Sequence, residues 1–119
     1  MHVEIRKVRE VVVVDLKGKL TIGLGDQILR ETIDELLAED WKRILLNLSE
    51  VSFMDSAGVG ELVEGMRTAK RLGAELKLLN LSERVHSTLY MARLLPIFEI
   101  YASEDEALAH FGDAEPKPS

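Results

Sequence analysis

The sequence predicts an α/β domain with a mostly parallel sheet of about four or five strands, an antiparallel edge and about four helices. Residues 3–7 alternate apolar and polar side chains, residues 11–14 are all valine, and the short Arg9-Glu10 connection is typical of a hairpin. Beyond this hairpin, short apolar segments alternate with segments whose apolar residues recur at helical spacing. Residues 44–48 are almost wholly apolar, as in a strand covered on both faces.

Length and composition indicate one folded domain. The chain has 119 residues, of which 46% are hydrophobic and 30% are charged, as in ordinary globular proteins. We assign residues 1–112 to the domain and expect residues 113–119, which offer no apolar anchor, to form a disordered tail. There is no cysteine, no signal-peptide pattern and no apolar run near the roughly 18 residues of a membrane span. We therefore expect a cytoplasmic protein without a membrane partner.

Four helices are predicted from apolar spacing and from residues that begin or end helices. The apolar positions expected to pack are Leu29, Ile33, Leu36 and Leu37, then Val59, Leu62, Val63 and Met66, then Val85, Leu89 and Met91 or Ala92, and finally Ala107, Leu108 and Phe111. The expected N-caps are Asp26, Asp55 or Ser56, Ser82 and Ser103. The helices should end near Trp41, at Gly73, before Pro96 and at Gly112.

Strands and loops are expected between these helices. Residues 76–81 are expected to form a buried strand and residues 97–101 a final one. Three glycines, Gly18, Gly23 and Gly25, are expected to lie in a loop between the hairpin and the first helix.

The loop predicted over residues 49–58 is the candidate site, because function in such sheets concentrates beyond the carboxyl ends of the strands. It ends in Asp55-Ser56-Ala57-Gly58, which places two short polar side chains at the start of the second helix. Capping alone would explain such a pair, since Asp and Ser satisfy free amides at a helix start and small residues assist packing.

A family resemblance gives this loop a function. The string LNLSEVSFMDSAGVGEL, residues 46–62, resembles the signature of the STAS domain family, named for sulphate transporters and anti-sigma-factor antagonists. The resemblance extends from the opening hairpin through the last helix. It implies a free-standing bacterial antagonist that regulates transcription, in which the serine of an Asp-Ser-x-Gly core is phosphorylated by an ATP-dependent serine kinase, itself the anti-sigma factor. That serine is Ser56 here.

The resemblance further implies a partner switch. Unphosphorylated protein would bind the anti-sigma factor serine kinase and displace a sigma factor. Phosphorylated protein would release the kinase until a serine phosphatase of the metal-dependent type restores it. The implied partner-binding residues are Asp55, Ser56, Ala57, Gly58 and Thr21. This chain would need no cofactor and no catalysis of its own.

Thr21 departs from the family's pattern. Many of these antagonists carry an acidic residue after a Gly-x-Leu turn, whereas Gly18-Lys19-Leu20 is followed here by Thr21. Some multi-component members phosphorylate threonines, so Thr21 is a minor phosphorylation candidate, although a residue at the end of a strand is the simpler interpretation.

Other functional classes have weaker support. The net charge of −6 argues against a nucleic-acid partner, because binding to phosphates needs clustered Lys and Arg. A hydrolytic triad of Ser56, His86 and Asp55 would need glycine where Met54 stands in the nucleophile elbow. No cluster of histidines suggests a metal site, and a lone Gly-x-Gly is poor evidence for nucleotide binding. A scaffold or regulatory subunit of a stress-sensing complex, phosphorylated at the same serine, stays the alternative.

Overall fold

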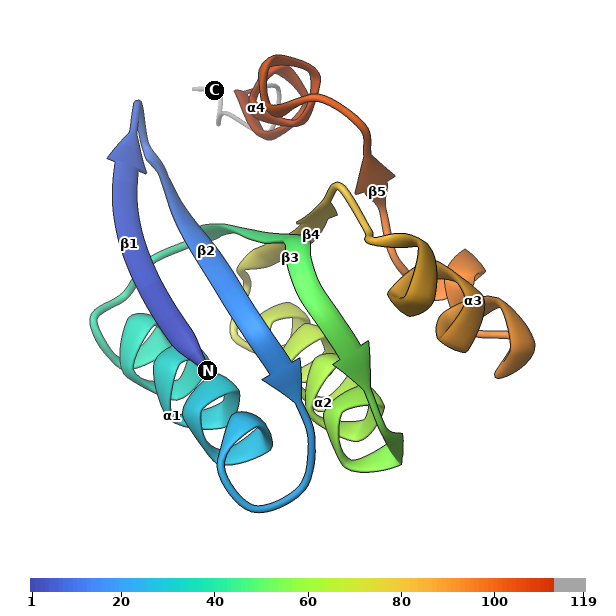
Figure 1. Cartoon of the computed structure of the whole chain (residues 1–119). Helices are drawn as coiled ribbons and strands as arrows, with labels where there is room; N and C mark the ends of the chain where they lie inside the picture. The colour runs from blue at the N-terminus through green and yellow to red at the C-terminus, as the bar shows by residue number, and fades with distance from the viewer. Residues whose placement is uncertain (113–119) are drawn as a thin grey trace.

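Within residues 1–112, the part of the chain that a computed structural model describes, the backbone forms a five-stranded sheet in the order β1-β2-β3-β4-β5 (Figure 1). The elements are β1 (His2–Val8), β2 (Val11–Leu20), α1 (Gly25–Ala38), β3 (Arg43–Met54), α2 (Ser56–Arg71), β4 (Glu75–Leu79), α3 (Glu83–Met91), the short helix η1 (Leu95–Ile97), β5 (Ile100–Tyr101) and α4 (Glu104–Gly112). Strand β1 pairs antiparallel with β2, and the other pairs are parallel. This confirms the predicted α/β class. The tail predicted over residues 113–119 lies outside the described residues.

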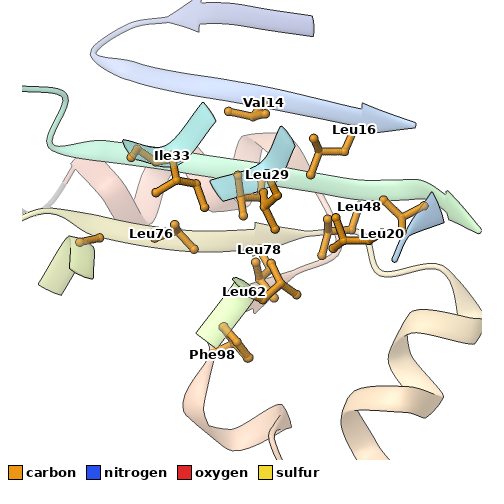
Figure 2. Packing of buried hydrophobic residues seen from close by; sticks show 14 of the residues in the cluster. Val14, Leu16, Leu20, Leu29, Ile33, Leu48, Leu62, Leu76, Leu78 and Phe98 are labelled. Atoms are coloured by element: carbon orange, nitrogen blue, oxygen red, sulfur yellow. The ribbon is translucent and has the colours of Figure 1, made fainter. Parts of the chain in front are cut away.

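Both faces of the sheet are packed around the first residues of β2 and β3 and the end of β4. Helices α1 and α2 lie together on one face, and Figure 2 shows part of the core between them and the sheet, including Leu29, Ile33 and Leu62. On the other face, α4 contributes a smaller cluster, which consists of Val11, Val13, Leu45, Leu79, Ala107, Leu108 and Phe111. Because alternate valines of residues 11–14 face opposite sides of the sheet and both sides are packed, all four are buried.

Strands β2 and β3 are longer than the sequence indicates. Gly18, expected in a loop, lies inside β2 with φ 123°, beside a shift in the pairing register with β3. Residues 49–54, expected in the loop of the candidate site, continue β3 as far as Met54. The apolar run is interrupted at Ser49 and Glu50, whose side chains are exposed, and the smaller cluster that includes α4 contains no residue of β3 beyond Leu45.

Helix α1 differs from the prediction at both ends. It begins at Gly25 without a side-chain cap, and Asp26, the expected N-cap, lies in the first turn. It ends at Ala38 rather than near Trp41. Asp40 adopts φ 70°, and the Trp41 amide donates to the Leu36 carbonyl oxygen at 3.1 Å, which closes the helix.

The third helix also ends early. Helix α3 stops at Met91 rather than just before Pro96, because Arg93 adopts φ 62° and the chain turns away. Met91 and Ala92 are therefore exposed, contrary to expectation. The flanking strands are shorter than predicted, with β4 ending at Leu79 and β5 confined to Ile100 and Tyr101.

Three predicted helix signals are confirmed. Ser82 accepts from the Val85 amide at the start of α3, and Ser103 accepts from the Glu106 amide at the start of α4. Gly73 follows α2 with φ 78°, the left-handed conformation expected of a terminating glycine.

Candidate functional site

The candidate site lies where β2 and β3 end side by side. Leu20 pairs with Met54 as the last residue pair of the two parallel strands, and the Asp55 amide donates to the Leu20 carbonyl oxygen at 3.3 Å. The segment after β2, residues 21–24, and the start of α2 therefore emerge together at the carboxyl ends of the strands (Figure 1). We call residues 21–24 the post-β2 loop.

Asp55 is the N-cap of α2 and also holds the post-β2 loop. Its backbone is extended, with φ −101° and ψ −173°, and its Oδ1 accepts from the Gly58 amide at 3.0 Å. The second carboxylate oxygen, Oδ2, accepts from the Ile22 amide at 3.0 Å. One carboxylate thus joins the helix start to the neighbouring loop. The sequence indicated the cap but not the bond to Ile22.

These two backbone hydrogen bonds also set the charge of the site. The hydrogen bond from the Ile22 amide has the largest effect on the pKa of Asp55, and the bond from the Gly58 amide has the next largest. Both lower this pKa below its ordinary value of 3.8. Asp55 is therefore a carboxylate at neutral pH. A negative charge at the start of a helix interacts favourably with the helix dipole.

Ser56 is the first residue of α2, and its side chain is exposed. Among residues 1–112, no group forms a hydrogen bond with its hydroxyl. Because Asp55 is the cap, Ser56 is not needed for capping. The hydroxyl stands beside the amide end of a helix, where added negative charge is favoured.

Gly58 explains why a small residue stands in the first turn of α2. A Cβ at this position would lie 2.1 Å from the Leu20 carbonyl oxygen and 2.9 Å from Met54 Cγ, so only glycine fits without a shift of the backbone. Gly58 is buried and Ala57 is half-buried, whereas Ser56 faces solvent. The close contact between α2 and the end of β2 holds Ser56 at the surface.

Thr21 directly follows β2 and is partly exposed. Its carbonyl oxygen accepts from the Asp26 amide at 3.0 Å, and its side chain forms no hydrogen bond within residues 1–112. The structure therefore places Thr21 in the same loop that Asp55 holds.

Sequence reasoning missed Ile22 and Leu24, the neighbours of Thr21 in this loop, which are 75% and 62% exposed. Two large aliphatic residues separated by glycine in a loop were the available signal.

The arrangement does not assemble a hydrolytic triad. The Asp55 carboxylate binds main-chain amides on both sides, and the His86 ring stacks on Tyr90 of its own helix, with centroids 6.5 Å apart. No group of three or more His, Asp or Glu side chains within residues 1–112 could hold a metal ion. None of the helices in that part of the chain is long and apolar enough to cross a membrane.

Comparison with known proteins identifies the family. Residues 2–107 match the STAS domain, so the chain belongs to the STAS domain family. It is 28% identical over 108 residues to the anti-sigma F factor antagonist of Paenibacillus polymyxa, covering 91% of this chain and 92% of the relative. It is 30% identical over 105 residues to the anti-sigma-B factor antagonist of Bacillus subtilis, covering 88% and 94%. These relatives are regulators rather than enzymes, which agrees with the non-enzymatic prediction.

Solved structures agree with this assignment. The anti-sigma factor antagonist SpoIIAA in its unphosphorylated form superposes with a TM-score of 0.79 at 27% identity, covering 97% of this chain and 100% of that one. The phosphorylated form of the Bacillus cell fate determinant SpoIIAA gives a TM-score of 0.71 at 28% identity, covering 92% and 99%. The predicted STAS fold is thus confirmed.

Proposed function

We propose that this chain is an anti-sigma-factor antagonist whose binding to an anti-sigma factor serine kinase is controlled by reversible phosphorylation of Ser56. The observation that carries the proposal is the exposed Ser56 hydroxyl, which forms no hydrogen bond within residues 1–112 and stands at the first residue of α2. The names of the relatives support the antagonist role, and the phosphorylated form of SpoIIAA supports control by phosphate. The protein would act in the cytoplasm.

The reaction at Ser56 is a phosphoryl transfer that the kinase catalyses. The Ser56 Oγ forms a bond to the γ-phosphorus of ATP, the bond from that phosphorus to ADP breaks, and the hydroxyl proton passes to a base of the kinase. A serine phosphatase of the metal-dependent type reverses the change by hydrolysis. This chain supplies the hydroxyl and the docking surface.

Phosphorylation should leave the fold intact. A phosphoryl group adds about −1.5 to −2 charges at pH 7, and at Ser56 it meets the amide end of α2, where negative charge is favoured. The cap does not depend on the Ser56 hydroxyl, because Asp55 accepts from the Gly58 amide. Neither helix nor cap need be lost when Ser56 is modified.

Release is therefore expected to arise at the interface with the kinase. The phosphoryl group would stand beside the ionised Asp55, so the pair would concentrate negative charge in a surface that must be desolvated on binding. Ser56, Ala57 and Thr21 would form the contacting face of this surface, while Asp55 and Gly58 hold its shape. Thr21 is a secondary candidate for phosphorylation.

The test compares Ser56→Asp with Ser56→Ala. We expect both variants to keep the near-ultraviolet circular dichroism and the cooperative thermal unfolding of the wild type, with only Ser56→Ala still binding the kinase in isothermal titration calorimetry. A Ser56→Asp protein without tertiary structure would contradict release at the interface. On size exclusion, a monomer that binds one kinase favours the antagonist, whereas a very large assembly favours the scaffold role.

A further inference from the structure

We propose that Ile22 and Leu24 are the apolar anchors that the kinase recognises in the unphosphorylated protein, and that Asp55 positions them. This inference rests on the proposed function and names the partner chemistry of the same site. Ile22 and Leu24 are 75% and 62% exposed, which makes them among the most exposed large apolar side chains within residues 1–112. Two exposed aliphatic side chains in one short loop beside a functional residue are candidates for a protein contact surface.

Ile22, the first of the two anchors, is joined by a hydrogen bond to the residue that precedes Ser56. The Ile22 amide donates to Oδ2 of Asp55 at 3.0 Å, and Asp55 immediately precedes Ser56. A partner that covers the Ser56 hydroxyl would therefore meet the post-β2 loop as well. One surface would combine the switch residue with the apolar anchors.

The post-β2 loop is ordered before any partner binds. Asp26 Oδ1 accepts from the Gly23 amide, the Asp26 amide donates to the Thr21 carbonyl oxygen, and the Ile28 amide donates to the Leu24 carbonyl oxygen, each at 3.0 Å. With the bond from Ile22 to Asp55, the loop is held at both ends. A loop held in one conformation loses little conformational entropy on binding, so its side chains can serve as anchors.

The charges around the loop indicate the chemistry of the partner. Asp26 and Asp55 both bind loop amides, so two carboxylates flank the aliphatic pair. The complementary surface is an apolar pocket with Lys or Arg at its rim. The same carboxylates disfavour an anionic lipid surface, which attracts basic segments. We therefore assign the anchors to a protein partner.

The experiment measures Kd for the purified kinase that phosphorylates Ser56, with Ile22→Ser and Leu24→Ser each compared with the wild type. We expect each variant to raise Kd roughly tenfold to hundredfold, because a buried aliphatic anchor would be lost. Leu72→Ser is the matched control, since Leu72 is 50% exposed at the opposite end of α2. Its Kd should stay within about twofold of the wild type.

Asp55→Asn tests the positioning role. We expect faster hydrogen exchange of the Ile22 amide and a higher Kd, with unchanged near-ultraviolet circular dichroism. The combination of Asp55→Asn with Ile22→Ser should raise Kd by less than the product of the two single effects, because both act through the loop. Independent effects that multiply fully would contradict positioning by Asp55.

The outcomes separate this inference from the proposed function. A wild-type protein that binds the kinase and is phosphorylated at Ser56, with Kd unchanged by Ile22→Ser and Leu24→Ser, overturns the anchors alone. A wild type that binds no such kinase overturns both proposals. Anchor-dependent sedimentation with vesicles of phosphatidylcholine and phosphatidylglycerol, without an effect on kinase affinity, would also overturn the inference and assign the loop to membranes.

Discussion

Gly58 and Leu20 determine how α2 meets the sheet. The Leu20 carbonyl oxygen occupies the space next to Gly58, where a Cβ would lie only 2.1 Å away. The Leu20 oxygen also accepts from the Asp55 amide, so the end of β2 contacts the helix start at two points. Ser56 lies between these two contacts and is held at the surface by them.

Gly58→Ala should destabilise the protein and disturb the site. We expect a loss of about 2 kcal/mol or more in the free energy of unfolding, because the added methyl group forces the backbones of α2 and β2 apart. Urea denaturation measures this change.

The matched control is Gly60→Ala, on the same helix, where a Cβ would meet nothing within 4 Å. That variant should gain about 0.5–1 kcal/mol from helix propensity. Similar changes in the two variants would contradict the close-contact argument.

Asp15 should make stability sensitive to acid. It accepts from Arg6 Nε at 2.6 Å and from Asn47 Nδ2 at 2.8 Å, and the bond from Arg6 is the largest cause that lowers the pKa of Asp15. When folding lowers the pKa of a carboxyl group, the ionised group stabilises the folded protein. This stabilisation is complete at pH values above the ordinary pKa of the group, which it has in the unfolded chain. This stabilisation disappears as the pH falls through the folded value.

Asp15→Asn should therefore cost about 1–3 kcal/mol at pH 7. The difference from the wild type should shrink in acid and vanish below the folded pKa of Asp15, as measured by urea denaturation across pH. Asp34→Asn, which removes the same charge from an exposed position of α1, should change stability by less than about 0.5 kcal/mol. A constant difference between wild type and Asp15→Asn at every pH would argue against the predicted linkage.

The buried ammonium of Lys77 should depend on Glu99. Lys77 is only 5% exposed and is paired with the Glu99 carboxylate, and its Nζ lies 5.2 Å from the centroid of the Phe111 ring. Glu99→Ala should cost about 1–3 kcal/mol, because the charge loses its partner. Adding Lys77→Met to that variant should restore most of the loss.

A double-mutant cycle with urea denaturation measures this coupling. The exposed ion pair between Lys42 and Asp40, with atoms 3.1 Å apart, is the control and should give about 0.5 kcal/mol or less. Equal coupling in the two cycles would contradict a special role for burial at Lys77.

Local side-chain signals predicted much of this structure. The valines of residues 11–14 indicated a strand, the apolar residues 44–48 indicated a strand covered on both faces, and Ser82, Ser103 and Gly73 indicated helix ends correctly. Each signal acts within a few residues of the chain, which is why the sequence reveals it.

The features that the sequence did not predict depend on contacts between segments that are distant along the chain. The second half of β3 is a strand because it pairs with β2, and its buried residues, Val51 and Met54, are three positions apart and so lack the alternation that would indicate a strand. The bond from Ile22 to Asp55 joins segments that are separated by helix α1 and strand β3. The sequence around Gly58 indicates only a small residue for packing, because the backbone oxygen that excludes a side chain there belongs to Leu20 of β2.

Phosphate mapping identifies the acceptor serine of this protein. The purified protein is incubated with ATP, magnesium and each histidine-kinase-like serine kinase of the source organism, and the modified residue is located by tandem mass spectrometry. We expect one phosphate per chain, on Ser56, and none on Ser56→Ala. Phosphate on another residue, or an unmodified Ser56 with a kinase that binds the protein, would contradict this expectation.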